Sequence, residues 1–143
     1  MLNTNLANPH GLSNNCSLST ANDLTKLCSY AMKNPQFRKI VNTQNYSYPI
    51  AGGIKDETEK ENMNPNKVRP TSSKKIEKGE WENTNRMLGE GWSGIKTGVT
   101  PNAGPCLAAS CQKTLSGRQY EFLVILLGSE SMEARWREVR NLV

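Results

Sequence analysis

The sequence predicts a mixed α/β (α+β) fold, in which helices pack against an antiparallel sheet. The apolar residues of the 143-residue chain fall into two blocks, residues 21–41 and 95–143. The first block has the spacing of amphipathic helices, and the second holds three short apolar runs followed by another helical pattern. Turn-forming residues at 101–102 and 116–117 separate these runs, so neighbouring strands are expected to pair as hairpins.

Two helices are expected in the first block, after a loop over residues 1–18. Thr20 can cap the first helix, with Asp23 completing an acidic capping box. One face of this helix is apolar and comprises Ala21, Leu24, Leu27, Cys28 and Ala31. Pro35 ends it and opens a second helix capped by Asn34, with Phe37, Ile40 and Val41 expected to face inward.

Between the two blocks the apolar pattern disappears. Residues 46–50 are consistent with a short strand, and residues 52–80 are polar and rich in charges of both signs. We expect a solvated polar insertion at about 52–80, because such a composition buries too little apolar surface to fold by itself.

The second block predicts three strands at 94–100, 106–112 and 120–127. The last is apolar on both faces, so we expect it inside a sheet that is covered from both sides. Residues 129–131 start a terminal helix. Its expected buried stripe is Met132, Trp136, Val139 and Val143.

Composition excludes several functional classes. The net charge is +5, but basic residues are spread among acids and are not interleaved with aromatic residues, which disfavours nucleic-acid binding. Four cysteines without Cys-x-x-Cys spacing, and a single histidine, predict no zinc site and no cofactor. Cys106 and Cys111 should point to opposite faces of one strand, where they cannot bridge, and the cysteines are expected to be small buried thiols. The longest apolar run, 122–127, is too short to span a membrane, and no secretory signal is present.

Lys96-Thr97-Gly98 is the most informative motif, because Lys-Thr-Gly is one of three elements that define penicillin-recognising serine hydrolases. The motifs around it are Asn8 to Leu12, Ser19-Thr20-Ala21 with Asp23, Asn83 to Arg86, and Arg135 seven residues after Gly128. In this order the chain resembles the C-terminal part of serine-type D-alanyl-D-alanine carboxypeptidases, the low-molecular-weight penicillin-binding proteins, except over roughly residues 51–80. The resemblance implies a partial domain of β-lactamase/transpeptidase-like fold over 1–143. Members of this family act outside the cytoplasmic membrane.

A peptide with a free carboxylate could lie beside a strand that carries this motif. Gly98 leaves room for the peptide, Thr97 offers a hydroxyl to its carboxylate, and Lys96 adds positive charge. By resemblance, Lys96 is catalytic, the Val99 N–H helps to form the oxyanion hole, and Arg135 helps to hold the substrate carboxylate. The alternative for Arg135 is a solvated side chain on the outer face of the terminal helix. The implied ligands are a D-Ala-D-Ala-terminated peptide or a β-lactam.

The other two family motifs are not recognisable in their expected places. Ser72-Ser73-Lys74-Lys75 and Ser13-Asn14-Asn15 match Ser-x-x-Lys and Ser-x-Asn, but we interpret both as chance matches. His10 is expected to be structural.

Two main hypotheses follow. In the first, the chain is a piece of a carboxypeptidase, and its nucleophile comes from upstream sequence or from a companion protein chain. In the second, the chain is a catalytically inactive pseudoenzyme that acts as a structural subunit, and a partner orders residues 52–80. A third, a class A β-lactamase relative, leaves the 8–12 and 83–86 motifs unexplained.

Overall fold

The computed structural model describes residues 1–50 and 77–143, so most of the polar insertion expected at 52–80 lies outside the described residues. The chain divides into two compact units. The larger unit comprises Met1–Gln44 and Asn83–Val143, and the smaller comprises Asn45–Glu82. We describe each unit separately.

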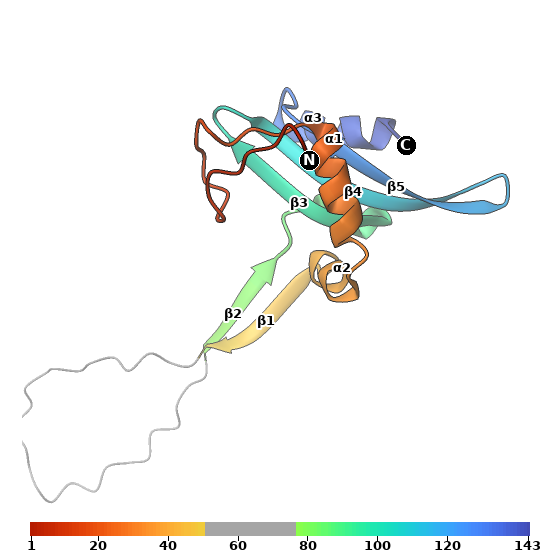
Figure 1. The fold of residues 1–143 in the computed structure, drawn as a ribbon. Helices are drawn as coiled ribbons and strands as arrows, with labels where there is room; N and C mark the ends of the chain where they lie inside the picture. Colours follow the sequence, from red (N-terminus) through yellow and green to blue (C-terminus); the bar gives the residue numbers. More distant parts are fainter. Residues whose placement is uncertain (51–76) are drawn as a thin grey trace, which may run out of the picture. The chain divides into compact units, whose positions relative to one another are not determined.

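The larger unit contains a three-stranded antiparallel sheet in the order β3-β4-β5 (Figure 1). Its elements are α1 (Ala21–Ala31), α2 (Pro35–Val41), the short 3₁₀ helix η1 (Arg86–Glu90), β3 (Trp92–Thr100), β4 (Gly104–Leu115), β5 (Arg118–Leu126) and α3 (Met132–Asn141). The predicted fold class is confirmed, and all three predicted strands and all three predicted helices are present in this unit.

The two faces of the sheet carry different helices. The main core lies between one face and α3, where Leu107, Ala109 and Val124 pack with Trp136 and Val139. Because successive strand residues point to opposite faces, Ala108 and Ile125 point to the other face. They share a pocket there with residues of α1. The sheet is therefore covered by α3 on one face and partly by α1 on the other.

The helix start signals were read correctly from the sequence, with one exception. The Thr20, Asn34 and Ser131 side chains each accept a hydrogen bond from a backbone N–H in the first turn of their helix. Asp23 does not complete a capping box. Its buried carboxylate instead accepts hydrogen bonds from Asn3 N at 2.8 Å and Thr4 Oγ1 at 2.9 Å, which ties the N-terminal segment to α1.

Three packing predictions were wrong. In the described part of the sheet, β5 is an edge strand and β4 is central. The apolar residues on both faces of β5 are explained by helices above and below it, since α1 and α3 both contact it. Ile40 is 70% exposed, because α2 buries only part of its apolar side. Met132 is 45% exposed, because other residues form the buried face of α3, namely Ala134, Arg135, Trp136 and Val139.

The smaller unit is a hairpin in which β1 (Asn45–Ile50) pairs antiparallel with β2 (Glu77–Glu82). β1 was expected, whereas β2 begins inside the segment predicted to be a polar insertion. The Tyr46 and Tyr48 rings stack, with centroids 6.2 Å apart. In the two units together, none of the helices is long and apolar enough to cross a membrane.

Candidate functional site

A β-bulge in β3 decides where the Lys-Thr-Gly side chains point. Gly94 pairs with Ala109, but Lys96 pairs with Ala108, so Ile95 is an extra residue in β3. Partners across an antiparallel pair point to the same face. The bulge therefore shifts the alternation by one residue and places Lys96 on the α1 face with Ala108.

The free edge of β3 has a closed half near Gly94. The Gly94 N–H donates to Asn42 Oδ1 at 3.1 Å. A Cβ placed on Gly94 would lie 2.6 Å from the Val41 carbonyl oxygen and 3.2 Å from Asn85 Nδ2. The edge is thus covered here by α2 and by the segment before η1.

The other half of this edge, Lys96–Thr100, is open among the described residues. A Cβ placed on Gly98 would meet no atom within 4 Å. The adjacent Val99 side chain is 57% exposed, although it lies on a strand of a packed sheet. A strand edge of this kind offers main-chain donors and acceptors to an added extended peptide.

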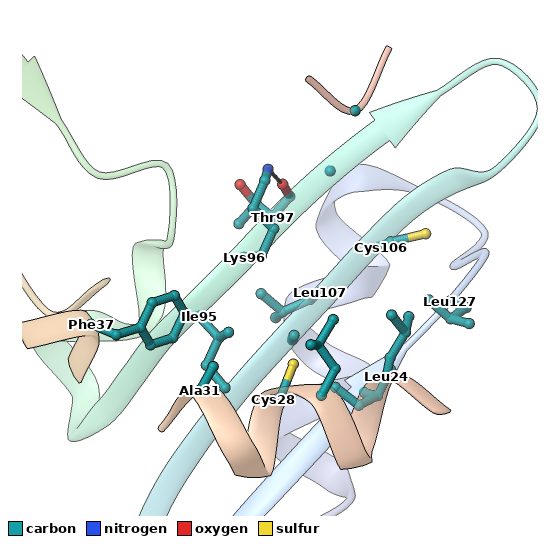
Figure 2. Close-up of a pocket in the computed structure, with 15 residues that line it drawn as sticks. Leu24, Cys28, Ala31, Phe37, Ile95, Lys96, Thr97, Cys106, Leu107 and Leu127 are labelled. Carbon is teal, nitrogen blue, oxygen red and sulfur yellow. Dashed lines mark hydrogen bonds between the residues drawn. The ribbon is translucent and has the colours of Figure 1, made fainter. Parts of the chain in front are cut away.

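A pocket of about 520 Å³ lies beside the open half. One wall comes from α1 through Leu24, Cys28 and Ala31, and the facing wall includes Ile95 and Leu107 (Figure 2). Lys96, Thr97 and Gly98 also line this pocket, and Figure 2 shows the first two on β3, across the pocket from α1. The pocket is therefore apolar inside and polar where the motif lies.

The Lys96 ammonium is available for a ligand. Lys96 is exposed, its Nζ donates to the Thr97 carbonyl oxygen, and no ion pair in the described residues involves it. Across residues 1–50 and 77–143, no cluster of His, Cys, Asp and Glu could hold a metal ion.

Arg135 reaches the same strand from the opposite face. Its side chain is only 3% exposed, and its Nη1 donates to the carbonyl oxygens of Gly98 at 3.3 Å and Cys106 at 3.2 Å. The guanidinium lies 4.2 Å from the centroid of the Trp136 ring, and burial lowers its pKa. The solvated alternative for Arg135 is therefore wrong. Arg135 does not line the pocket, so its connection to the motif runs through the backbone of Gly98.

Thr97 has a partner that the sequence reasoning did not assign to the site. Its Oγ1 lies 2.5 Å from Thr84 Oγ1, a hydrogen bond in which either hydroxyl can be the donor. Thr84 belongs to the 83–86 motif, to which only the family resemblance, and no site role, was assigned from the sequence. The signal was a threonine between two asparagines, a composition typical of a side-chain-stabilised turn.

The N-terminal motif forms a turn. Asn8 Oδ1 accepts from Gly11 N at 2.8 Å, and His10 Nδ1 accepts from Leu12 N at 3.2 Å. The expected structural role of His10 agrees with this geometry. Ser13 lies in a second cleft of about 730 Å³ formed mainly by this loop and the β3–β4 connection, whereas Ser72 lies outside the described residues.

The cysteines are all free, as expected, but only two are buried. Burial raises the pKa of the Cys28 and Cys111 thiols, which is typical of inert structural cysteines. Cys16 is exposed and Cys106 is half-buried, contrary to the expectation of buried thiols. Cys106 lines both pockets.

Helices on both faces of an antiparallel sheet, with Lys-Thr-Gly on its edge strand, define a domain of the penicillin-recognising serine hydrolase type. A family model described as D-alanyl-D-alanine carboxypeptidase matches residues 1–126. The chain therefore belongs to the D-alanyl-D-alanine carboxypeptidase family.

Individual relatives agree with this family. The chain is 32% identical over 146 residues to a D-alanyl-D-alanine carboxypeptidase of Streptomyces sp. (strain K15), covering 99% of this chain and 42% of that protein. A solved variant of the Streptomyces K15 DD-transpeptidase matches 98% of this chain and 46% of its own, with 30% identity and a TM-score of 0.70. Penicillin-binding protein D2 from Listeria monocytogenes, solved in a cefotaxime-bound form, shares the fold at 22% identity and a TM-score of 0.67. This chain thus spans less than half the length of these relatives.

Proposed function

We propose that this chain forms the carboxylate-binding side of a serine-type D-Ala-D-Ala carboxypeptidase-like site. The ligand is a peptide ending in D-Ala-D-Ala, or a β-lactam that resembles it. The observation that carries this proposal is the open half of the β3 edge, where Gly98 has free space and Lys96 and Thr97 line one pocket.

Each motif residue has a role in this proposal. The peptide lies along residues 96–100 as an added strand, with Thr97 donating to its terminal carboxylate. Lys96 supplies positive charge beside the reacting group, and the Val99 N–H is an oxyanion-hole donor. Arg135 adds buried positive charge below Gly98, and its hydrogen bonds to two carbonyl oxygens fix the main chain that receives the peptide.

The nucleophilic serine, in this proposal, comes from a polypeptide equivalent to the portion of the relatives that this chain does not span. Support comes from the apolar surface around the pocket. Leu27 and Leu127 line the pocket yet are each 42% exposed. Exposed apolar groups clustered around a cavity mark a surface that another polypeptide covers.

The same surface supports a second candidate, a catalytically inactive structural subunit. In that case the partner covers the apolar pocket without bringing a serine to Lys96. Both candidates share the carboxylate-binding strand, and they differ in whether a covalent intermediate forms.

A ligand-binding experiment tests the carboxylate-binding strand, which both candidates share. Titration of the isotopically labelled chain with acetyl-D-Ala-D-Ala should shift the amide resonances of residues 96–100, and the carboxamide form of this peptide should bind at least about tenfold more weakly. A Thr97→Val variant should lose this discrimination. Equal binding of acid and amide would refute a carboxylate site.

Covalent labelling separates the two candidates. Labelled penicillin should leave no adduct on this chain alone, and an adduct on Ser13 or Ser72 would contradict our assignment of those matches to chance. The chain is then co-expressed with a family polypeptide that carries Ser-x-x-Lys. Labelling of the resulting complex supports the enzyme, whereas a stable complex without labelling supports the structural subunit.

A further inference from the structure

We infer that Thr84 is a positioning residue that directs the hydroxyl proton of Thr97 toward the ligand carboxylate. This inference rests on the proposed function, because it assigns a partner to the hydroxyl that binds the carboxylate. Thr84 lies outside the Lys-Thr-Gly motif, 13 residues before Thr97.

The contact between the two hydroxyls is short and accessible. The Oγ1 atoms lie 2.5 Å apart, Thr84 is exposed and Thr97 is half-buried. Thr84 precedes η1, and its hydroxyl contacts Thr97 in the open half of β3. A ligand on this edge would meet both hydroxyls.

Two asparagines hold Thr84 in place. Asn83 Nδ2 donates to the carbonyl oxygens of Val41 at 3.2 Å and Thr43 at 3.0 Å. Asn83 Oδ1 accepts from Asn85 N at 2.9 Å, which closes a turn around Thr84.

Asn85 anchors the other side of this turn. It is 5% exposed, and its Oδ1 accepts from Met87 N at 3.1 Å. The exposed threonine therefore lies between two fixed residues, and its backbone has little freedom to move away from Thr97.

The donor and acceptor capacity of a hydroxyl gives this contact a direction. Each hydroxyl has one proton and two acceptor lone pairs. If Thr97 donates to Thr84, no proton remains for a carboxylate. When Thr97 is the group that donates to a bound carboxylate and the contact between the hydroxyls is kept, Thr84 must donate to Thr97. Such a chain of hydrogen bonds strengthens the terminal one through polarisation.

Two variants of Thr84 and one control variant elsewhere in the sheet test the inference. Thr84→Val keeps the shape but removes the hydroxyl, Thr84→Ser keeps the hydroxyl, and Thr114→Val is a matched control on an exposed stretch of β4. Each full chain is titrated with acetyl-D-Ala-D-Ala and with its carboxamide. The χ1 rotamer of Thr97 is measured from three-bond couplings without ligand.

We expect Thr84→Val to weaken binding of the acid peptide by about fivefold to tenfold, as the loss of one charge-assisted chain of hydrogen bonds predicts. Its Thr97 rotamer should become averaged, and the ratio of acid to amide affinity should fall. Thr84→Ser and Thr114→Val should stay within about twofold of the wild type. A purely structural role would lower stability without changing the ratio of acid to amide affinity.

The outcomes separate the two proposals. If the wild-type chain binds the acid peptide and Thr84→Val binds it equally well, the role of Thr84 is overturned and the proposed function stands. If the wild-type chain shows no preference for the acid peptide, the proposed function fails, and the role of Thr84 fails with it.

Discussion

Gly94 and Gly98 lie four residues apart on β3, yet their surroundings differ completely. At Gly94 an added Cβ would lie 2.6 Å from a backbone oxygen of Val41, so folding itself requires the glycine. At Gly98 an added Cβ would meet nothing within 4 Å. No packing requirement in the described residues explains the second glycine, and the free space at Gly98 fits the proposed approach of a ligand main chain.

The bulge at Ile95 separates these two halves of the strand. Before the bulge, the free edge is filled by the protein's own α2 and the turn around Thr84. After it, the edge is open and Lys96 faces the pocket. One strand thus joins a part that stabilises the fold to a part that is available for binding.

The largest expected effect is at the closed half. Gly94→Ala should lower the free energy of unfolding by about 2 kcal/mol or more, because backbone atoms of α2 must move to make room. Urea unfolding measures this, with Gly98→Ala as the matched control, which should stay within about 0.5 kcal/mol of the wild type. A Gly94→Ala variant as stable as its control would break the comparison.

At the open half of β3, a substitution of Gly98 should change peptide binding and leave stability nearly unchanged. Gly98→Val should weaken binding of acetyl-D-Ala-D-Ala by about tenfold or more, since a branched side chain would block the approach of the peptide main chain. Its urea midpoint should change little, because valine suits a strand. Isothermal titration and urea unfolding on the same sample provide both values. If Gly98→Val loses stability but not peptide binding, then Gly98, like Gly94, is required for folding and not for binding.

Arg135 extends the comparison of the two halves of β3, because it donates a hydrogen bond to the Gly98 carbonyl oxygen in the open half. Arg135→Lys keeps the charge but cannot reproduce the planar fork of donors, so one of the two bonds to Gly98 O and Cys106 O should be lost. We expect stability to fall by about 1 kcal/mol and the peptide to bind a few-fold more weakly. Arg137→Lys, on the exposed side of α3, serves as the control. Identical behaviour of the two variants would contradict a role for Arg135.

A smaller effect on the stability of the fold is expected from Asp23, which lies far from Gly94 and Gly98 in the sequence. Hydrogen bonds from Asn3 N and Thr4 hold the pKa of this carboxyl below its usual value of 3.8. A pKa that is lower in the folded state stabilises the fold at neutral pH, and this contribution disappears as pH falls below about 3.8 toward the folded-state pKa.

The matching experiment compares wild type with Asp23→Asn by thermal unfolding at several pH values. The stability difference between them should be present at pH 7 and should shrink below about pH 3.8. A difference that grows on acidification would reverse the assigned sign.

Local signals made much of this fold predictable. The caps at Thr20, Asn34 and Ser131 are decided by residues within one turn, and the three strands are bounded by turn residues next to them. Such features depend on neighbours in sequence, which a single sequence contains.

What could not be predicted depends on residues far apart in the chain. The bulge exists only in the register between β3 and β4, and the need for Gly94 arises from Val41, more than fifty residues earlier. The burial of Arg135 likewise depends on how α3 packs below Gly98. β2 escaped prediction because its residues are polar, and pairing rather than hydrophobicity defines it.

Amide hydrogen exchange along β3, with and without saturating acetyl-D-Ala-D-Ala, tests the central claim most directly. If the open edge receives the carboxyl end of a peptide, amides in Lys96–Thr100 should exchange more slowly with the peptide bound, while those around Gly94 should not change. Unchanged exchange in both halves, or equal protection by the carboxamide peptide, would contradict the account.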